Sequence, residues 1–165
     1  MTLSEVQERY PYMFEGEHIG HEVQLGWTDV FGQVCQEVDQ LLGPDPRRFH
    51  WTQLKEKFGS ARWYYSLERL PGELIERPRV TFSSFNPADG SVTRLNPTDS
   101  VIVHKSVSDR IAAVIQAGQD KTSTLCIICG DAGSPDVLKD YALVLCKKHA
   151  KERRNGGLRR YWSQD

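Results

Sequence analysis

Four residues near the C-terminus have the types and the spacing of a metal site. Cys126 and Cys129 form a Cys-x-x-Cys pair followed by Gly130, and Cys146 and His149 stand three positions apart. Structural zinc is usually held in a tetrahedron by four thiolate or imidazole ligands. A tight turn lets the first pair reach one ion, and the first turn of a helix places the second pair on one face. The sequence therefore predicts one structural Zn²⁺ held by these two pairs.

The segment between the two ligand pairs predicts the form of the module. It contains Pro135 and the β-compatible run 141–145, which is enough for a loop and a short hairpin. A zinc knuckle, a hairpin and then the start of a helix form the layout of a treble clef. Because the protein fills all four coordination positions, no position remains for a reactive water. The ion is expected to contribute folding free energy, on the order of 10 kcal/mol in small zinc fingers.

Buried cysteines without a metal are the alternative, because free cysteine is often a core residue. Two pairs at this separation favour the metal over that alternative. Cys35 lies in an amphipathic stretch, where burial is favoured over use as a nucleophile. His18 and His21 could form a second metal pair, but no cysteine lies near them in the sequence, so two surface histidines are the favoured interpretation.

Nucleases of the histidine-asparagine-histidine class also carry treble-clef zinc. Their catalysis requires a histidine pair or an aspartate-histidine pair between the two ligand halves, to hold a metal and activate water. Between Cys129 and Cys146 this chain has Asp131, Asp136 and Asp140 but no histidine. The chain also lacks a P-loop and a Gly-x-Ser-x-Gly elbow. A metal-dependent nuclease is therefore the least favoured hypothesis.

The charges of the chain are concentrated at its two ends, although the net charge is −1. Residues 1–46 hold nine acids and one base, and the residues after Cys146 hold seven bases and two acids. Basic side chains neutralise phosphates, and aromatic rings stack on unpaired bases. The alternatives are a solvated helix end, or a tail that packs on the acidic region. The residues predicted to contact nucleic acid or another partner are Lys147, Lys148, Lys151, Arg153, Arg154, Arg159, Arg160 and Trp162.

Composition predicts a globular cytoplasmic protein with no contact to a membrane. The 165 residues are 39% hydrophobic and 26% charged, which is ordinary for a folded domain. No apolar run approaches the roughly 20 residues that cross a bilayer, and the N-terminus lacks the pattern of a signal peptide. Three of the four cysteines lie close together beside a histidine, which favours metal binding in a reducing compartment over disulfides.

Helical periodicity is clearest between Thr28 and Leu42. Thr28 is the expected N-cap, and Gly43 followed by Pro44 ends the helix. The apolar residues form one stripe of a 3.6-residue helix. They are Trp27, Val30, Phe31, Val34, Cys35, Val38, Leu41 and Leu42. A short helix is also expected at 4–9. A further helix is expected to begin at a capping box of Ser106 and Asp109 and to run toward Ala117.

Two hairpins are expected between these helices. The first joins strands at 51–58 and 61–67 through Gly59-Ser60, and the second joins pieces at 80–82 and 91–95 through a turn at 86–90. Another strand is expected at 101–104. Four aromatic residues of the first hairpin are predicted as core or groove residues. They are Trp51, Phe58, Trp63 and Tyr65. The predicted fold class is α+β, with a helix packed on a small antiparallel sheet and a C-terminal treble-clef zinc module.

The order of these motifs resembles a group of small uncharacterised proteins from phages and bacteria. Members have a Gly-Trp before a helix, a Lys-Glu-Lys-Phe-Gly hairpin, then Cys-x-x-Cys-Gly and Leu-Cys-x-x-His. The corresponding positions here are Gly26-Trp27, 55–59, 126–130 and 145–149. The chain departs from the group at 66–105, which has the form of an insertion, and at Ser60-Ala61 in the hairpin. The resemblance implies residues 1–120 as an α+β domain containing that insertion, and residues 121–165 as the zinc module with its basic tail.

The favoured function is a non-enzymatic, zinc-stabilised binding protein. Its expected partner is a host protein or nucleoprotein complex. The resemblance implies a phage or mobile-element origin, so the protein would act as an inhibitor or regulator, for example of a defence system. The alternative is a nucleic-acid-binding protein that uses the basic C-terminal helix. The sequence does not name the partner, the oligomeric state, the biological process or the role of 66–105.

Overall fold

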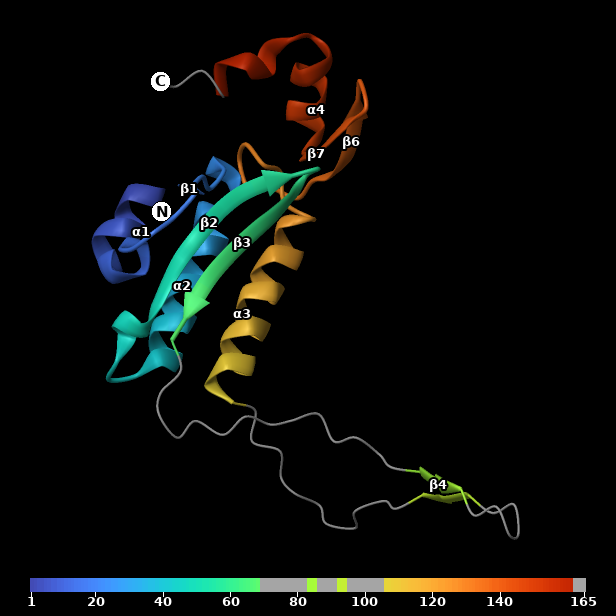
Figure 1. Ribbon diagram of the computed structural model, residues 1–165. Helices are drawn as coiled ribbons and strands as arrows, with labels where there is room; N and C mark the ends of the chain where they lie inside the picture. The colour runs from blue at the N-terminus through green and yellow to red at the C-terminus, as the bar shows by residue number, and fades with distance from the viewer. Residues whose placement is uncertain (69–82, 86–91, 95–105, 162–165) are drawn as a thin grey trace.

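The computed structural model describes residues 1–68, 83–85, 92–94 and 106–161. The chain is α+β, with four α-helices, three small sheets and four short 3-10 helices among these residues (Figure 1). The α-helices are α1 (Leu3–Arg9), α2 (Thr28–Leu42), α3 (Val107–Thr122) and α4 (Lys147–Arg154). The strands are β1 (Gly20–His21), β2 (Phe49–Lys57), β3 (Ser60–Leu67), β4 (Ser83–Phe85), β5 (Val92–Arg94), β6 (Ser134–Leu138) and β7 (Tyr141–Leu145). The 3-10 helices are η1 (Pro11–Phe14), η2 (Leu25–Trp27), η3 (Pro46–Arg48) and η4 (Gly157–Tyr161).

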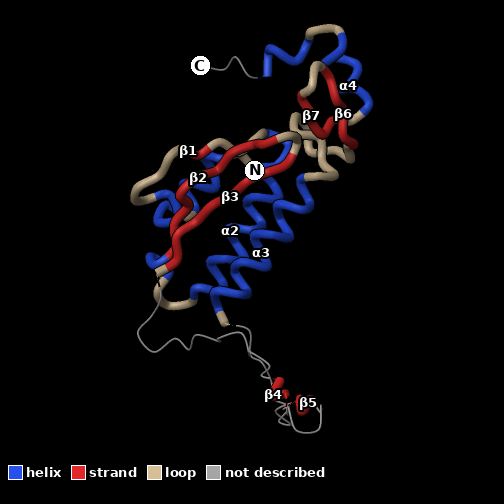
Figure 2. The backbone as a smooth tube through the Cα atoms, turned by 45° about the vertical axis from the view of Figure 1, so that its right-hand side comes forward, coloured by secondary structure: helices blue, strands red, loops and turns tan. Residues whose placement is uncertain are grey.

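The central sheet has the order β1-β2-β3. β2 and β3 pair antiparallel, with Leu54 opposite Trp63, and this pair confirms the first predicted hairpin. β1 pairs parallel with β2, which makes the sheet mixed rather than antiparallel throughout. α2 and α3 run side by side behind β2 and β3, as Figures 1 and 2 show together. The predicted packing of a helix on a small sheet is therefore present.

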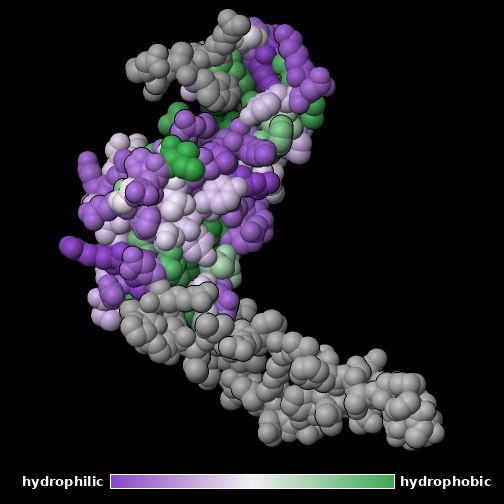
Figure 3. Space-filling view, in the orientation of Figure 1, coloured by the Kyte–Doolittle hydropathy of each residue, from purple (hydrophilic) through white to green (hydrophobic). Residues whose placement is uncertain are grey.

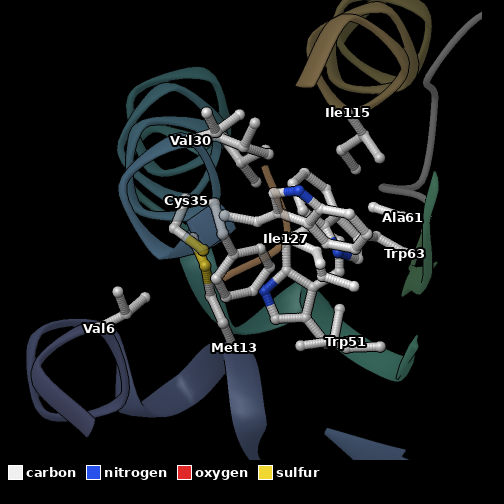
Figure 4. Packing of buried hydrophobic residues seen from close by; sticks show 14 of the residues in the cluster. Val6, Met13, Val30, Cys35, Trp51, Ala61, Trp63, Ile115 and Ile127 are labelled. Carbon is white, nitrogen blue, oxygen red and sulfur yellow. The ribbon is translucent and has the colours of Figure 1, made fainter. Parts of the chain in front are cut away.

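The hydrophobic core lies between the helices and the inner face of this sheet (Figure 4). The centroid of the Phe31 ring of α2 lies 5.3 Å from that of the Trp51 ring and 5.1 Å from that of the Trp63 ring. Trp51 and Trp63 are buried as predicted, and Tyr65 packs against the cluster. The core prediction is wrong for Phe58, which is 62% exposed. Phe58 begins the two-residue turn between β2 and β3, so its side chain projects from the end of the hairpin.

Side chains of α3 cover the free edge of β3. The Thr122 hydroxyl accepts from the backbone N–H of Ala61 at 3.1 Å, and the Gln119 amide oxygen accepts from that of Trp63 at 2.8 Å. An exposed strand edge offers unpaired N–H groups to other chains. The helix therefore satisfies donors of β3 that a further strand would otherwise take.

The local signals for helices are mostly confirmed. α3 begins at the capping box of Ser106 and Asp109 and continues past Ala117 to Thr122. α2 spans Thr28–Leu42 as expected, but Thr28 is its first residue and not its N-cap. The Thr28 hydroxyl instead donates to the carbonyl of Leu25, because the preceding 3-10 helix turns directly into α2.

The second predicted hairpin is present as the antiparallel pair of β4 and β5. Its second arm falls within the predicted 91–95. The predicted first arm at 80–82 and the predicted strand at 101–104 lie outside the described residues. Within the described part of the chain, no helix has the length and apolar character needed to cross a membrane. The division at residue 120 stays a prediction, and Ile127 shares one hydrophobic cluster with Trp51.

Candidate metal centre

The elements of the C-terminal part follow one another as a knuckle, a hairpin and a helix (Figure 1). In the knuckle, the N–H of Gly130 donates to the Cys126 carbonyl at 2.9 Å, and the N–H of Cys126 donates to the Asp131 carbonyl at 2.7 Å. Gly130 has a φ of +78°, a conformation that favours glycine. This turn brings the Cys126 and Cys129 thiols to the same side. β6 and β7 then return the chain to Cys146, which directly precedes α4.

The four predicted ligand atoms converge on one point. The Sγ, Sγ, Sγ and Nδ1 atoms of Cys126, Cys129, Cys146 and His149 all lie within 4.8 Å of one another. His149 Nδ1 is 3.3 Å from the Sγ atoms of both Cys126 and Cys146, and the Cys129 and Cys146 Sγ atoms are 3.8 Å apart. Thiolates bound tetrahedrally at about 2.3 Å would be separated by roughly 3.8 Å. The donor set and its spacing therefore fit a tetrahedral metal ion.

His149 is fixed by neighbours on the far side of its ring. Its Nε2 atom lies 3.4 Å from the Tyr161 hydroxyl and 3.9 Å from a carboxylate oxygen of Glu152. The Tyr161 ring meets the His149 ring edge-on at 5.5 Å between centroids. Such contacts orient a ligating imidazole and leave the other nitrogen to the metal. Sequence reasoning missed both neighbours, although Glu152 stands three positions after His149 on the same helix.

The thiols of the centre differ in acidity. Burial raises the pKa of Cys129 to about 12. Burial also acts to raise the pKa of Cys146. Backbone N–H groups of His149 and Lys148 and the two neighbouring thiols outweigh that effect, so the pKa of Cys146 is lowered. A metal ligand must be the thiolate, so the protein itself favours the ligand form of Cys146 more than that of Cys129.

The α+β part holds the knuckle directly. The N–H of Gly26 donates to the Ile127 carbonyl at 3.0 Å, and the Trp27 indole N–H donates to the Leu125 carbonyl at 3.3 Å. A side chain at Gly26 would collide with the backbone of the knuckle, including the Gly130 nitrogen at 2.6 Å. Gly26 and Trp27 therefore form the surface against which the knuckle packs.

The predicted basic contact residues divide into two groups. Arg153 is turned inward, with its side chain 10% exposed. It donates to the Tyr141 carbonyl at 2.7 Å and also to the carbonyl and carboxylate of Asp136, so it ties α4 to the β6–β7 hairpin. Arg154 pairs with the same carboxylate at 2.5 Å but is 60% exposed.

The other predicted basic contact residues lie on α4 and on η4. Lys147, Lys148 and Lys151 of α4 are exposed and form no ion pair with a described residue. Arg159 and Arg160 belong to η4, and Trp162 lies outside the described residues.

His18 and His21 do meet, but as stacked rings with centroids 4.0 Å apart. His21 Nε2 lies 2.9 Å from the Trp51 carbonyl. Burial lowers the pKa of His21. Within the described residues, the group at 126–149 is the only one whose ligand atoms converge as a metal site requires. His18 is exposed as predicted, whereas His21 is half-buried.

Comparisons with protein-family models, with curated proteins and with solved structures gave no match to this chain. The resemblance to small phage and bacterial proteins stays a prediction. What the structure supports of it is the group of three cysteines and one histidine that fits a zinc-binding module.

Proposed function

We propose that the chain is a non-enzymatic binding protein whose C-terminal part is organised by one structural Zn²⁺ in a treble clef. The observation that carries this proposal is the convergence of four protein ligand atoms within 4.8 Å. Three thiolates and one imidazole are a donor set typical of structural zinc. A full set of protein ligands gives the ion a role in folding rather than in activating water.

The treble clef accounts for the order of elements around the ligands. The first ligand pair comes from a knuckle, and the second pair comes from the residue before α4 and from its first turn. The hairpin between them is short, with five residues in each strand. A unit with so little apolar surface needs a further source of stability, and a bound metal is a common one.

The acids of this part support a structural role. Asp136 is 8% exposed and is paired with both Arg153 and Arg154, so its carboxylate is committed to holding the hairpin on α4. Asp131 lies against the Cys129 thiol, with 3.2 Å between Sγ and Oδ2. Among the described residues, neither carboxylate is paired with a histidine that could serve as the general base of a nuclease.

The partner in this proposal is a host protein or a nucleoprotein complex, and the chain acts on it as a phage or mobile-element factor. The polarised charge supports it, because no ion pair among the described residues joins an acid of residues 1–46 to a base after Cys146. The two charged ends therefore do not neutralise each other through an ion pair between described residues, and Lys147, Lys148 and Lys151 remain available to an acidic partner. The origin rests on the resemblance of the motifs, which supports a regulator or inhibitor, for example of a defence system.

A second candidate function is nucleic-acid binding through α4. The exposed side chains of Lys147, Lys148 and Lys151 favour it, because unpaired lysines on one short helix can contact successive phosphates. This candidate uses the same zinc-organised module but a different class of partner. It predicts binding that weakens steeply with added salt.

Affinity capture from a bacterial lysate, before and after nuclease treatment, tests the leading proposal against this alternative. A stoichiometric protein partner that survives nuclease and is lost when Lys147, Lys148 and Lys151 become glutamate supports the proposal. A partner that is lost on nuclease treatment favours the alternative. Metal-dependent cleavage of DNA or RNA by the purified protein, absent in Cys129→Ser, would contradict a non-enzymatic role.

A further inference from the structure

The outer face of the β2–β3 hairpin differs in chemistry from its inner face. Side chains alternate across a sheet, and Leu54 and Trp63 point into the core. Their neighbours therefore point outward, and these include Lys55 opposite Arg62 and Tyr64 opposite Gln53. Figure 3 views the molecule from the side on which β2 and β3 lie in front of α2, and its surface there is mainly hydrophilic.

The turn at the end of the hairpin lies close to β7. The Phe58 ring at the turn lies 6.1 Å from the Tyr141 ring of β7. The outer side of the hairpin and its turn thus combine three cations and two aromatic rings, and we name this surface the cationic–aromatic face. Its residues are Lys55, Lys57, Phe58, Arg62 and Tyr64.

The cations of the cationic–aromatic face have no acid partner among the residues that the structure describes. None of Lys55, Lys57 and Arg62 forms an ion pair with a described residue. Glu56 is the one acid of the hairpin, and its carboxylate accepts from the Gly59 N–H and from the Tyr141 hydroxyl. The face is therefore locally positive in a chain whose net charge is −1.

The aromatic rings of the face are exposed beside these cations. Phe58 is 62% exposed and Tyr64 48% exposed, so both rings are accessible to a ligand. The Lys55 ammonium lies 5.2 Å from the centroid of the Tyr64 ring, and that of Lys57 lies 5.7 Å from the Phe58 ring. Each of these lysines therefore holds its positive charge beside a ring.

We propose that the cationic–aromatic face binds a single-stranded nucleic acid. Unpaired bases stack on exposed aromatic rings, and adjacent cations neutralise the phosphates between those bases. A duplex hides its base faces and would use only the charges. Base stacking and phosphate neutralisation do not involve the 2′-hydroxyl, so single-stranded DNA and RNA should bind alike. The proposal concerns a surface other than α4, and it does not depend on the identity of a protein partner.

Fluorescence anisotropy with labelled oligothymidylate and oligouridylate of about twelve nucleotides tests the proposal in the zinc-loaded full chain. Replacing Lys55 and Arg62 together by alanine should weaken binding at least about tenfold at low salt. It should also reduce the slope of log K against log salt by about 1.4, because two phosphate contacts are lost. Tyr64→Ala should weaken binding about tenfold, while Tyr64→Phe, which keeps the stacking ring, should bind within about twofold of the unchanged chain.

The matched control removes the same charge from another surface. Arg110 and Lys121 are exposed on α3, and their joint replacement by alanine should leave affinity within about twofold. Circular dichroism spectra that match the unchanged chain exclude unfolding as the cause of lost binding. No anisotropy change with either oligonucleotide would overturn the proposal. Equal loss in the two double variants would also overturn it, as would a duplex or polyglutamate binding as tightly as the single strands.

Discussion

Gly26 and Cys126 lie backbone against backbone, so that a Cβ atom on Gly26 would overlap the Cys126 carbonyl oxygen. One hydrogen bond from the Gly26 N–H to Ile127 and one from Trp27 to Leu125 fix the same contact. A residue that precedes α2 by two positions therefore supports Cys126 of the candidate metal centre, about a hundred positions later in the sequence. The physical role of the Gly-Trp pair is to pack against the knuckle and to hydrogen-bond to its backbone.

Gly26→Ala should destabilise the fold by roughly 3 kcal/mol, because backbone atoms that cannot move aside occupy the space of the new methyl group. Gly20→Ala is the matched control, since nothing lies within 4 Å of its Cβ position. Urea unfolding monitored by circular dichroism measures both. A Gly26→Ala chain as stable as Gly20→Ala would show that the close contact is not maintained in solution.

Arg153→Ala should lower the free energy of unfolding by about 3 kcal/mol. It leaves the buried Asp136 carboxylate with one fewer partner and removes the hydrogen bond to the Tyr141 carbonyl. Arg154→Ala should cost less than about 1 kcal/mol, because that guanidinium is 60% exposed and its pairing is screened by water. Thermal unfolding of the zinc-loaded variants gives the comparison. Equal losses in the two variants would be inconsistent with the inward placement of Arg153.

Thr122→Val should destabilise the chain by about 1–3 kcal/mol, since it leaves the buried N–H of Ala61 without an acceptor. Thr124→Val, on an exposed residue just past α3, should change stability by less than about 0.5 kcal/mol. Hydrogen exchange of the Ala61 amide provides a second readout, and it should accelerate in Thr122→Val alone. Unchanged exchange at Ala61 would argue against the proposed covering of the β3 edge.

The four cysteines should react with a thiol reagent in two groups, under different conditions. Cys35 is fully buried, and burial raises its pKa to about 12, so its reactive thiolate form is scarce at neutral pH. In the zinc-loaded chain the other three cysteines should be protected by the metal. Addition of a chelator should expose Cys126, Cys129 and Cys146, and Cys35 should react only in denaturant. Early reaction of Cys35 would contradict its place in the core.

Local patterns in the sequence predicted the main helices and the four Cys and His residues that the structure brings together, because residue spacing, caps and periodicity act over a few residues. The contacts that join distant segments could not be predicted in this way. β1 is two residues long, and its parallel pairing with Gln53 and Leu54 has no local signal. Arg153 was predicted to face a partner, but it turns toward Asp136 because the β6–β7 hairpin folds back onto α4. Phe58 was predicted as a core or groove residue because it belongs to the aromatic cluster of the hairpin. Its position in the turn instead leaves its ring exposed.

Elemental analysis of the purified full chain, combined with native mass spectrometry, tests the central claim most directly. The account predicts one zinc ion per chain. It also predicts that Cys129→Ser lacks stoichiometric metal and loses order in the residues after 121, with the loss seen as faster amide exchange. A chain that retains no stoichiometric metal when expressed with zinc, or a Cys129→Ser variant whose C-terminal part keeps its protection, would contradict the claim.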